Sequence, residues 1–183
     1  MRIILLASIA AVAVTSAASA QTADGSAYIG VGYSKLDVDL LDFDGLNLIG
    51  GYTFNPYFAA EAEAYIGISE EEFDDGTISA SVKTNYGLSA FLRAQYPLGE
   101  QVSVFGRVGY STFELEAEAN LPGLFSGGDS DTFDGLAYGI GGEVAFAGPN
   151  AVRIDYTRYE VEEIDDAGLD TPSMLSISYI RRF

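Results

Sequence analysis

The sequence predicts an all-β domain in which eight antiparallel strands run up and down around a closed barrel that spans a membrane. Three observations predict this class. Runs of residues alternate between apolar and polar side chains, the charges on the polar faces nearly cancel, and tight turns alternate with long acidic connections. An apolar outer face in contact with lipid and a polar interior would account for all three.

The composition of the 183-residue chain excludes several classes of function. It contains 27 acidic and 9 basic residues, with no histidine and no cysteine. The net charge of −18 opposes binding to nucleic acid, because each phosphate would meet a repelling field. The missing residue types are the commonest metal ligands, the usual proton shuttle and the thiol nucleophile. We therefore expect one domain with no cofactor, no enzymatic activity and no nucleic-acid partner.

The first 20 residues have the three parts of a secretory signal peptide. Arg2 provides a positive start, residues 3–14 form an apolar core, and Ala18-Ser19-Ala20 fits a small-residue cleavage site. The core is too short for a transmembrane helix, which needs about 20 residues. The alternative is a buried N-terminal helix. We predict a signal peptide at 1–20 and a transmembrane barrel domain at 21–183.

Alternating runs separated by Gly, Pro and Asn make up the remainder of the chain. Most of them contain 9–14 residues, more than the usual strand of about 5–6. A tilted strand that crosses a bilayer needs about 9–11 residues, so these lengths fit a membrane barrel. The predicted strands are 27–38, 46–54, 58–69, 82–96, 102–115, 136–146, 152–161 and 175–183.

Each predicted strand has one apolar and one polar face. In the strand 58–69, Ala62 and Ala64 share a face opposite Glu61 and Glu63. A soluble barrel would also alternate, with its apolar face directed inward. Glycine, serine and paired charges opposite apolar rows that end in large aromatics favour the membrane barrel. One such apolar row, which we expect to face lipid, is Val102, Val104 and Val108.

The charged residues on the polar faces form a candidate network inside the barrel. Buried charges are tolerated when they are paired and hydrogen-bonded, so an enclosed interior requires a nearly balanced set. An eight-stranded barrel is just wide enough inside for its own side chains, and Phe91, Phe105 and Tyr159 also take inward positions, so we expect a filled lumen. The predicted network comprises Glu61, Glu63, Glu143 and Asp155 with Lys83, Arg93, Arg107, Arg153 and Arg182.

The connections between the strands alternate in length. Three are tight turns containing Pro, Gly or Asn, and four are long and hold 21 of the 27 acidic residues. Membrane barrels have short turns on the periplasmic side and long loops outside. An even number of strands would place both termini on the short-turn side. The long connections are centred on 37–44, 70–75, 114–134 and 160–170.

Aromatic residues lie at both ends of the predicted strands. Aromatic side chains there would form the interfacial girdles of a membrane barrel, although any one of them could equally serve cross-strand packing. They are Phe54, Tyr57, Tyr96, Phe146 and Phe183 near the short turns and Tyr33, Tyr110 and Tyr138 near the long loops.

Acidic clusters in the long connections are weak candidates for binding Ca²⁺ or Mg²⁺, which prefer oxygen ligands. None of the clusters has the spacing of an EF-hand loop. The alternative is a solvated, self-repelling loop that keeps the rim soluble. The candidate ligands are Glu70, Glu71, Glu72, Asp74, Asp75, Asp129 and Asp131.

Three segments of this chain carry a resemblance to a known family. They are the opening Tyr28-Ile29-Gly30-Val31-Gly32-Tyr33, the hairpin from Gly50 to Tyr57, and the final strand. The chain resembles the OmpA/OmpX-like families of small eight-stranded outer-membrane barrels of Gram-negative bacteria. In that family the last strand ends on Phe, with apolar or aromatic residues at alternate preceding positions, and the assembly machinery reads this pattern as an insertion signal. Leu175, Ile177, Tyr179 and Phe183 match the pattern, whereas Arg181 stands where an aromatic residue is common.

The resemblance implies a non-enzymatic outer-membrane protein with a structural or surface-interaction role. Its partners would be outer-membrane lipid, lipopolysaccharide and the assembly machinery, and we expect a monomer. Relatives that act as enzymes use a histidine, which this chain lacks. The alternative function is a narrow, cation-preferring, porin-like channel favoured by the acidic mouth. A soluble periplasmic binding barrel is a third class.

Overall fold

The computed structural model describes residues 25–38, 41–74, 79–121, 125–160 and 171–183, with the backbone alone described for 41, 70–74, 79–85, 115–121 and 125–131. Strands account for nearly all of these residues, and no helix among them has the length and apolar character needed to cross a membrane. The strands are β1 (Ser26–Val38), β2 (Leu41–Asn55), β3 (Phe58–Gly67), β4 (Glu70–Asp74), β5 (Ser79–Pro97), β6 (Val102–Leu121), β7 (Phe125–Ala147), β8 (Asn150–Glu160) and β9 (Ser173–Arg182).

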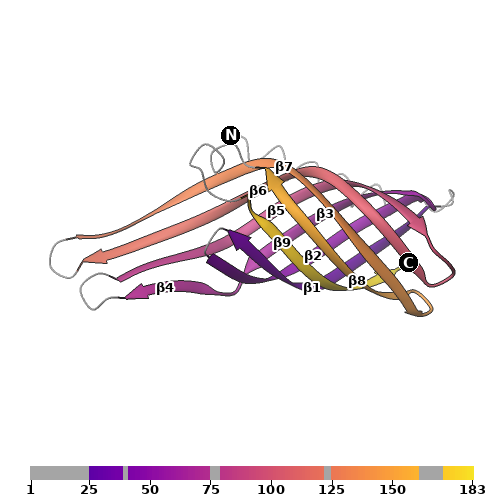
Figure 1. The fold of residues 1–183 in the computed structure, drawn as a ribbon, viewed down its shortest axis with the longest axis horizontal. Coiled ribbons are helices and arrows are strands. Elements are labelled where there is room, and N and C mark those ends of the chain that lie inside the picture. Colours follow the sequence, from indigo (N-terminus) through magenta and orange to yellow (C-terminus); the bar gives the residue numbers. More distant parts are fainter. Residues whose placement is uncertain (1–24, 39–40, 75–78, 122–124, 161–170) are drawn as a thin grey trace.

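The strands form one antiparallel sheet that closes on itself (Figure 1). The order is β3-β2-β1-β9-β8-β7-β6-β5-β4, and pairing of β3 with β5 completes the cylinder. Strand β4 pairs with β5 beyond the end of β3, so it extends that position in the wall without adding a ninth one. The predicted eight-stranded antiparallel up-and-down barrel is therefore confirmed.

The strands near the acidic connections are longer than predicted. Strand β7 covers Phe125–Ala147 where 136–146 was expected, and β6 continues to Leu121. Their pairing runs unbroken to Leu121 opposite Phe125. The prediction of a long loop over 114–134 was wrong, because it relied on side-chain alternation, whereas backbone hydrogen bonds hold this hairpin in register. In Figure 1 the hairpin extends well past the barrel wall.

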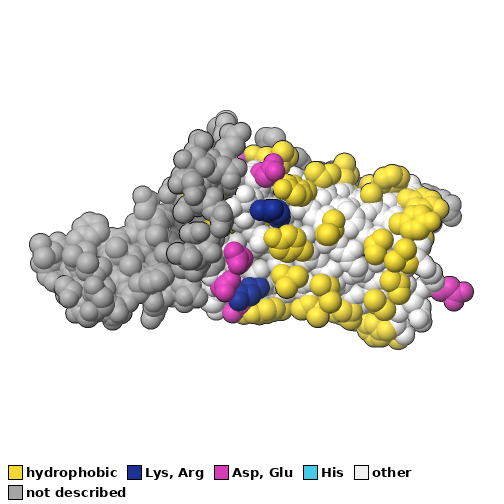
Figure 2. All heavy atoms as spheres, in the orientation of Figure 1, with side chains coloured by type: hydrophobic (Ala, Val, Ile, Leu, Met, Phe, Trp, Pro, Cys, Tyr) yellow, Lys and Arg dark blue, Asp and Glu magenta, His cyan; other side chains and the backbone are white. Residues whose placement is uncertain are grey.

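Hydrophobic side chains cover much of the barrel face seen in Figure 2 between its two ends. Val102, Val104 and Val108 are 41%, 42% and 55% exposed, so this row points outward as predicted. The aromatic residues expected at the two girdles are also exposed, Phe54 and Tyr33 among them. The alternation of the sequence thus places large apolar side chains on the surface and polar ones inside.

Two clusters of buried apolar side chains lie inside the barrel at different heights. One lies at the end where the tight turns join the strands, and we call it the short-turn cluster. The other lies toward the extended hairpin, and we call it the long-hairpin cluster. The short-turn cluster consists of Tyr28, Ile49, Ala59, Ala151 and Ile180. The long-hairpin cluster consists of Leu36, Phe43, Tyr65, Phe91, Phe113, Ala137, Tyr159 and Met174.

Two glycines have a defined role, Gly141 in strand β7 and Gly148 in the turn that follows it. Gly148 has a φ of 57°, a left-handed conformation that suits the tight turn between β7 and β8. Gly141 faces inward, and a Cβ atom there would overlap the ring of Phe105. Gly141 of the glycine-rich segment 139–142 therefore makes room for an aromatic ring inside a narrow cylinder.

Candidate functional site

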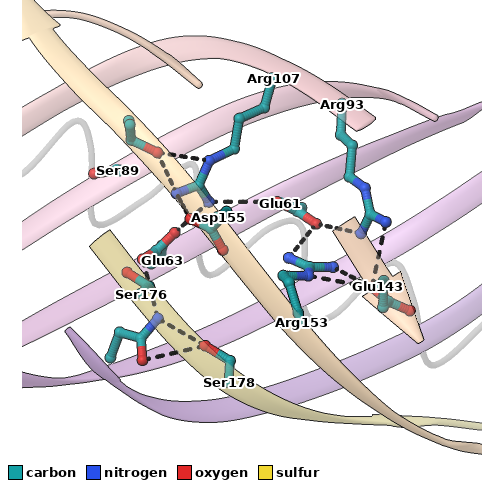
Figure 3. A network of polar contacts seen from close by, with 12 residues as sticks. Glu61, Glu63, Ser89, Arg93, Arg107, Glu143, Arg153, Asp155, Ser176 and Ser178 are labelled. Atoms are coloured by element: carbon teal, nitrogen blue, oxygen red, sulfur yellow. Dashed lines mark hydrogen bonds and ion pairs between the residues drawn. The ribbon is translucent and has the colours of Figure 1, made fainter. Parts of the chain in front are cut away.

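Charged side chains from six strands, β3 and β5 to β9, meet in the interior between the two apolar clusters (Figure 3). Seven of the predicted residues have side chains no more than 4% exposed, and Arg182, nearer the short-turn end, is 35% exposed. These eight residues, which we call the lumen network, are Glu61, Glu63, Arg93, Arg107, Glu143, Arg153, Asp155 and Arg182.

Arg107 of β6 connects two carboxylates through its two terminal nitrogens. Nη1 lies 2.6 Å from Glu63 Oε2, and Nη2 lies 2.6 Å from Asp155 Oδ2. Nε and Nη2 also donate to the hydroxyl of Thr157, at 3.1 and 2.6 Å. The guanidinium stands 4.3 Å from the centre of the Phe91 ring. A planar guanidinium suits this site because its donors point in several fixed directions within one plane.

Glu143 of β7 accepts from three arginines near the short-turn end. Arg93 Nη2 donates at 3.3 Å, Arg153 Nη2 and Nε donate at 3.1 and 3.2 Å, and Arg182 Nη2 pairs with the second oxygen. The ring of Phe105 lies 4.0 Å from the Arg93 guanidinium carbon and 5.0 Å from that of Arg153. Cation–π contact thus supports two of the three arginines on their apolar side.

Glu61 of β3 joins the two halves of the network. Its Oε1 is 3.0 Å from Arg93 Nη1 and 2.8 Å from Arg153 Nη1, and its Oε2 is 3.8 Å from Arg107 Nη1. The eight residues contribute four carboxylates and four guanidinium groups, so the formal charge of the network is zero. Such pairing is what makes buried ions tolerable, since each would be costly alone.

Several polar partners of the network were not among the predicted site residues. Tyr28 donates to Glu61 at 2.5 Å, and Asn47 donates to Glu63 at 3.3 Å and to Ser178 at 3.1 Å. Asn47 lies between Leu46 and Leu48, whose side chains are exposed, so extending the same alternation to this strand would have identified it. Tyr28 gives no such signal, because an aromatic residue at a strand end also fits an outer girdle.

Other predicted residues lie outside the described side chains. Lys83 is one of them, and its backbone pairs opposite Glu116, beyond a β-bulge between Thr84 and Tyr86 that interrupts the alternation of β5. Among the residues with described side chains, no group of three or more acidic residues could hold a metal ion. The divalent-ion candidates Glu70, Glu71, Glu72, Asp74, Asp75, Asp129 and Asp131 all lie outside that part of the chain.

The residues of the predicted assembly signal lie on the outer face of β9 and at the chain end. Leu175, Ile177, Tyr179 and Phe183 are all at least 41% exposed. Arg181 is exposed among them, and its Nη1 donates to Asn150 Oδ1 at 3.1 Å. The apolar row of the last strand is therefore presented to the surroundings of the barrel.

Comparison with known proteins identifies the family of this barrel. The family model of the outer membrane protein beta-barrel domain matches residues 4–183. The chain belongs to this family. It is accordingly an OmpA-like barrel of the bacterial outer membrane, and its outward apolar band faces lipid. Its short turns, by the asymmetry of such barrels, face the periplasm.

Relatives and solved structures agree with this assignment. Outer membrane protein A of Shigella flexneri is 27% identical over 112 residues, which are 61% of this chain and 32% of that protein. The match thus spans about a third of the length of the curated relatives. OprG of Pseudomonas aeruginosa has a TM-score of 0.60 at 13% identity, covering 87% of this chain and 96% of its own. Ail of Yersinia pestis has a TM-score of 0.58 at 20% identity, covering 87% and 97%. These two structures support the fold.

Proposed function

We propose that this outer-membrane barrel is non-enzymatic, has a closed lumen, and serves a structural and surface-interaction role. The observation that carries the proposal is the filling of the interior by its own side chains. The lumen network occupies the middle of the barrel, and an apolar cluster lies on each side of it. A continuous aqueous path would have to pass both clusters, whose mainly apolar side chains would not replace the hydration of an ion.

The surface role is supported by the part of the sheet that continues beyond the barrel. Strands β4 to β7 pair with one another there, and among the described residues the pairing of β7 with β8 begins where Leu136 lies opposite Glu160. The rim is acidic in sequence. Ail was solved with the heparin analogue sucrose octasulfate, but an acidic rim would repel such a polyanion. We infer that partners of this chain present cationic surfaces.

The same proposal covers the remaining partners. The outward apolar band would contact lipid, and lipopolysaccharide would surround the long-hairpin end. The exposed row Leu175, Ile177, Tyr179 and Phe183 would be read by the assembly machinery during insertion. A barrel with every wall strand paired on both sides needs no second copy to close, so we propose a monomer.

The closed lumen predicts no discrete conductance. Protein refolded into planar bilayers should give no stepwise currents across a range of salts and voltages, because both apolar clusters block the passage of hydrated ions. A known porin inserted in the same bilayers serves as the control for the measurement. Reproducible cation-selective steps would instead support the narrow channel.

We also propose that residues 1–20 are a signal peptide removed on export. The mass of the protein purified from outer membranes should then correspond to a mature chain that begins at Gln21. Replacing Ala18 and Ala20 by bulky residues should leave the precursor uncleaved. Recovery of the full-length chain from the native outer membrane would contradict the assignment.

A further inference from the structure

A small cavity lies inside the barrel at the short-turn end of the lumen network. Its volume is about 10 Å³, close to the least space that one water-sized particle requires. The lining contains three guanidinium groups and one carboxylate, so it carries an excess of positive charge. The residues that line the cavity are Tyr28, Thr53, Arg93, Gln95, Glu143, Arg153, Ile180 and Arg182.

The charges of the lumen network are divided unevenly between its two ends. Toward the long hairpin, Arg107 pairs with both Glu63 and Asp155. The short-turn half therefore holds three arginines against two carboxylates, Glu61 and Glu143, although the network as a whole is neutral. A guanidinium group does not give up its proton in proteins, so the surplus positive charge cannot be removed by deprotonation. A counter-ion is the remaining way to balance it.

The arginines around the cavity also have more donors than the two carboxylates accept. Arg93 is buried and reaches Glu61 and Glu143 through its terminal nitrogens (Figure 3). Its Nε has no hydrogen-bond partner among the described residues. Both oxygens of Glu143 already accept from arginines. A water molecule donates as well as accepts, whereas an anion only accepts, so surplus donors together with surplus positive charge favour an anion.

We propose that this cavity binds one chloride ion from the periplasm, held by Arg93 and Arg182. The volume selects a monatomic anion, because phosphate carries four oxygens around its phosphorus and is too large for the space. The side chain of Arg182 is 35% exposed, so the ion can enter from the short-turn end without separating the deeper ion pairs. Because the short turns face the periplasm, that compartment supplies the ion.

Bromide tests the position of the site, because it resembles chloride and scatters X-rays anomalously. Crystals of the protein purified from outer membranes are grown with sodium bromide as the only halide. We expect an anomalous peak inside the cavity, in contact with Arg93 Nε. Density at that position without an anomalous signal would identify a water molecule and overturn the proposal. Bromide found on exposed side chains alone, as an adventitious ion only, would overturn it as well.

A stability titration tests whether the ion binds in solution. Protein folded in phosphatidylcholine vesicles is unfolded with urea while gluconate, which is too bulky for the cavity, is exchanged for chloride on both sides of the membrane at constant ionic strength. An ion that binds only the folded barrel stabilises it. The ratio of folded to unfolded protein should therefore rise along a saturating curve, by about tenfold once chloride reaches about ten times its Kd.

Two neighbouring arginines supply the variant and its control. Arg182→Gln removes a charge from the cavity and should abolish the dependence on chloride. Arg181→Gln removes the same charge from the outer face and should retain the full dependence. A general effect of salt on unfolding would appear equally in both variants and would overturn the proposal, as would no chloride effect on the unmodified protein. If Arg182→Gln does not fold, the bromide map and the titration of the unmodified protein decide the question.

Discussion

Replacing Arg107 by methionine is expected to lower the free energy of unfolding by about 3–5 kcal/mol, the cost of removing one partner of a buried ion pair. Arg107 is the only described ion-pair partner of both Glu63 and Asp155. The substitution keeps much of the side-chain volume but leaves two carboxylates buried without a counter-ion. The measurement is the urea midpoint of unfolding, with its slope, for protein folded in vesicles.

A second substitution separates the loss of charge pairing from a general defect. Adding Asp155→Asn to Arg107→Met removes one of the stranded charges and should recover part of the lost stability. The control is Arg181→Ala on the outer face, which should change the unfolding free energy by no more than about 0.5 kcal/mol. If Arg107→Met were as mild as Arg181→Ala, the guanidinium would not lie in a desolvated interior.

The same ion pairs show how far the sequence predicts the site. Glu61 and Glu63 were predicted to face inward because their strand alternates between alanine and acidic residues. Arg107 was predicted to face inward because it lies on the face opposite the valine row of its own strand. Which acid meets which base was not predictable. Arg107 and Asp155 lie on strands separated by β7, and their 2.6 Å contact depends on barrel closure and strand tilt together.

Other failures have equally local causes. A β-bulge between Thr84 and Tyr86 changes which residues of β5 face inward. The inward positions after the bulge therefore do not predict the side of the strand on which Lys83 lies. The long-hairpin cluster was missed in part because Phe43 and Met174 fall just outside the strands drawn from the pattern.

Replacing Phe113 by alanine is expected to cost about 3–5 kcal/mol of unfolding free energy, the range for truncating a buried phenylalanine. Phe113 is in the long-hairpin cluster, with its ring 6.3 Å from that of Tyr65 and 4.8 Å from that of Tyr159 in edge-to-face arrangements. Truncation would remove both contacts and leave a cavity inside a rigid cylinder. The urea midpoint in vesicles again measures the effect, with outward-facing Tyr138→Ala as the control, since lipid can fill the space that it vacates.

A pair of substitutions with compensating changes in side-chain volume, at Phe113 and at its neighbour Gly87, tests whether Phe113 packs inward as described. Gly87 of β5 is paired opposite Phe113, and a Cβ atom on Gly87 would overlap the phenyl ring. Gly87→Val alone should therefore destabilise the barrel, by about 1–3 kcal/mol for overpacking. In the Phe113→Ala background the same valine enters the vacated space, so it should restore stability. Additive losses in the double variant would contradict this packing, because the two sites would then be independent.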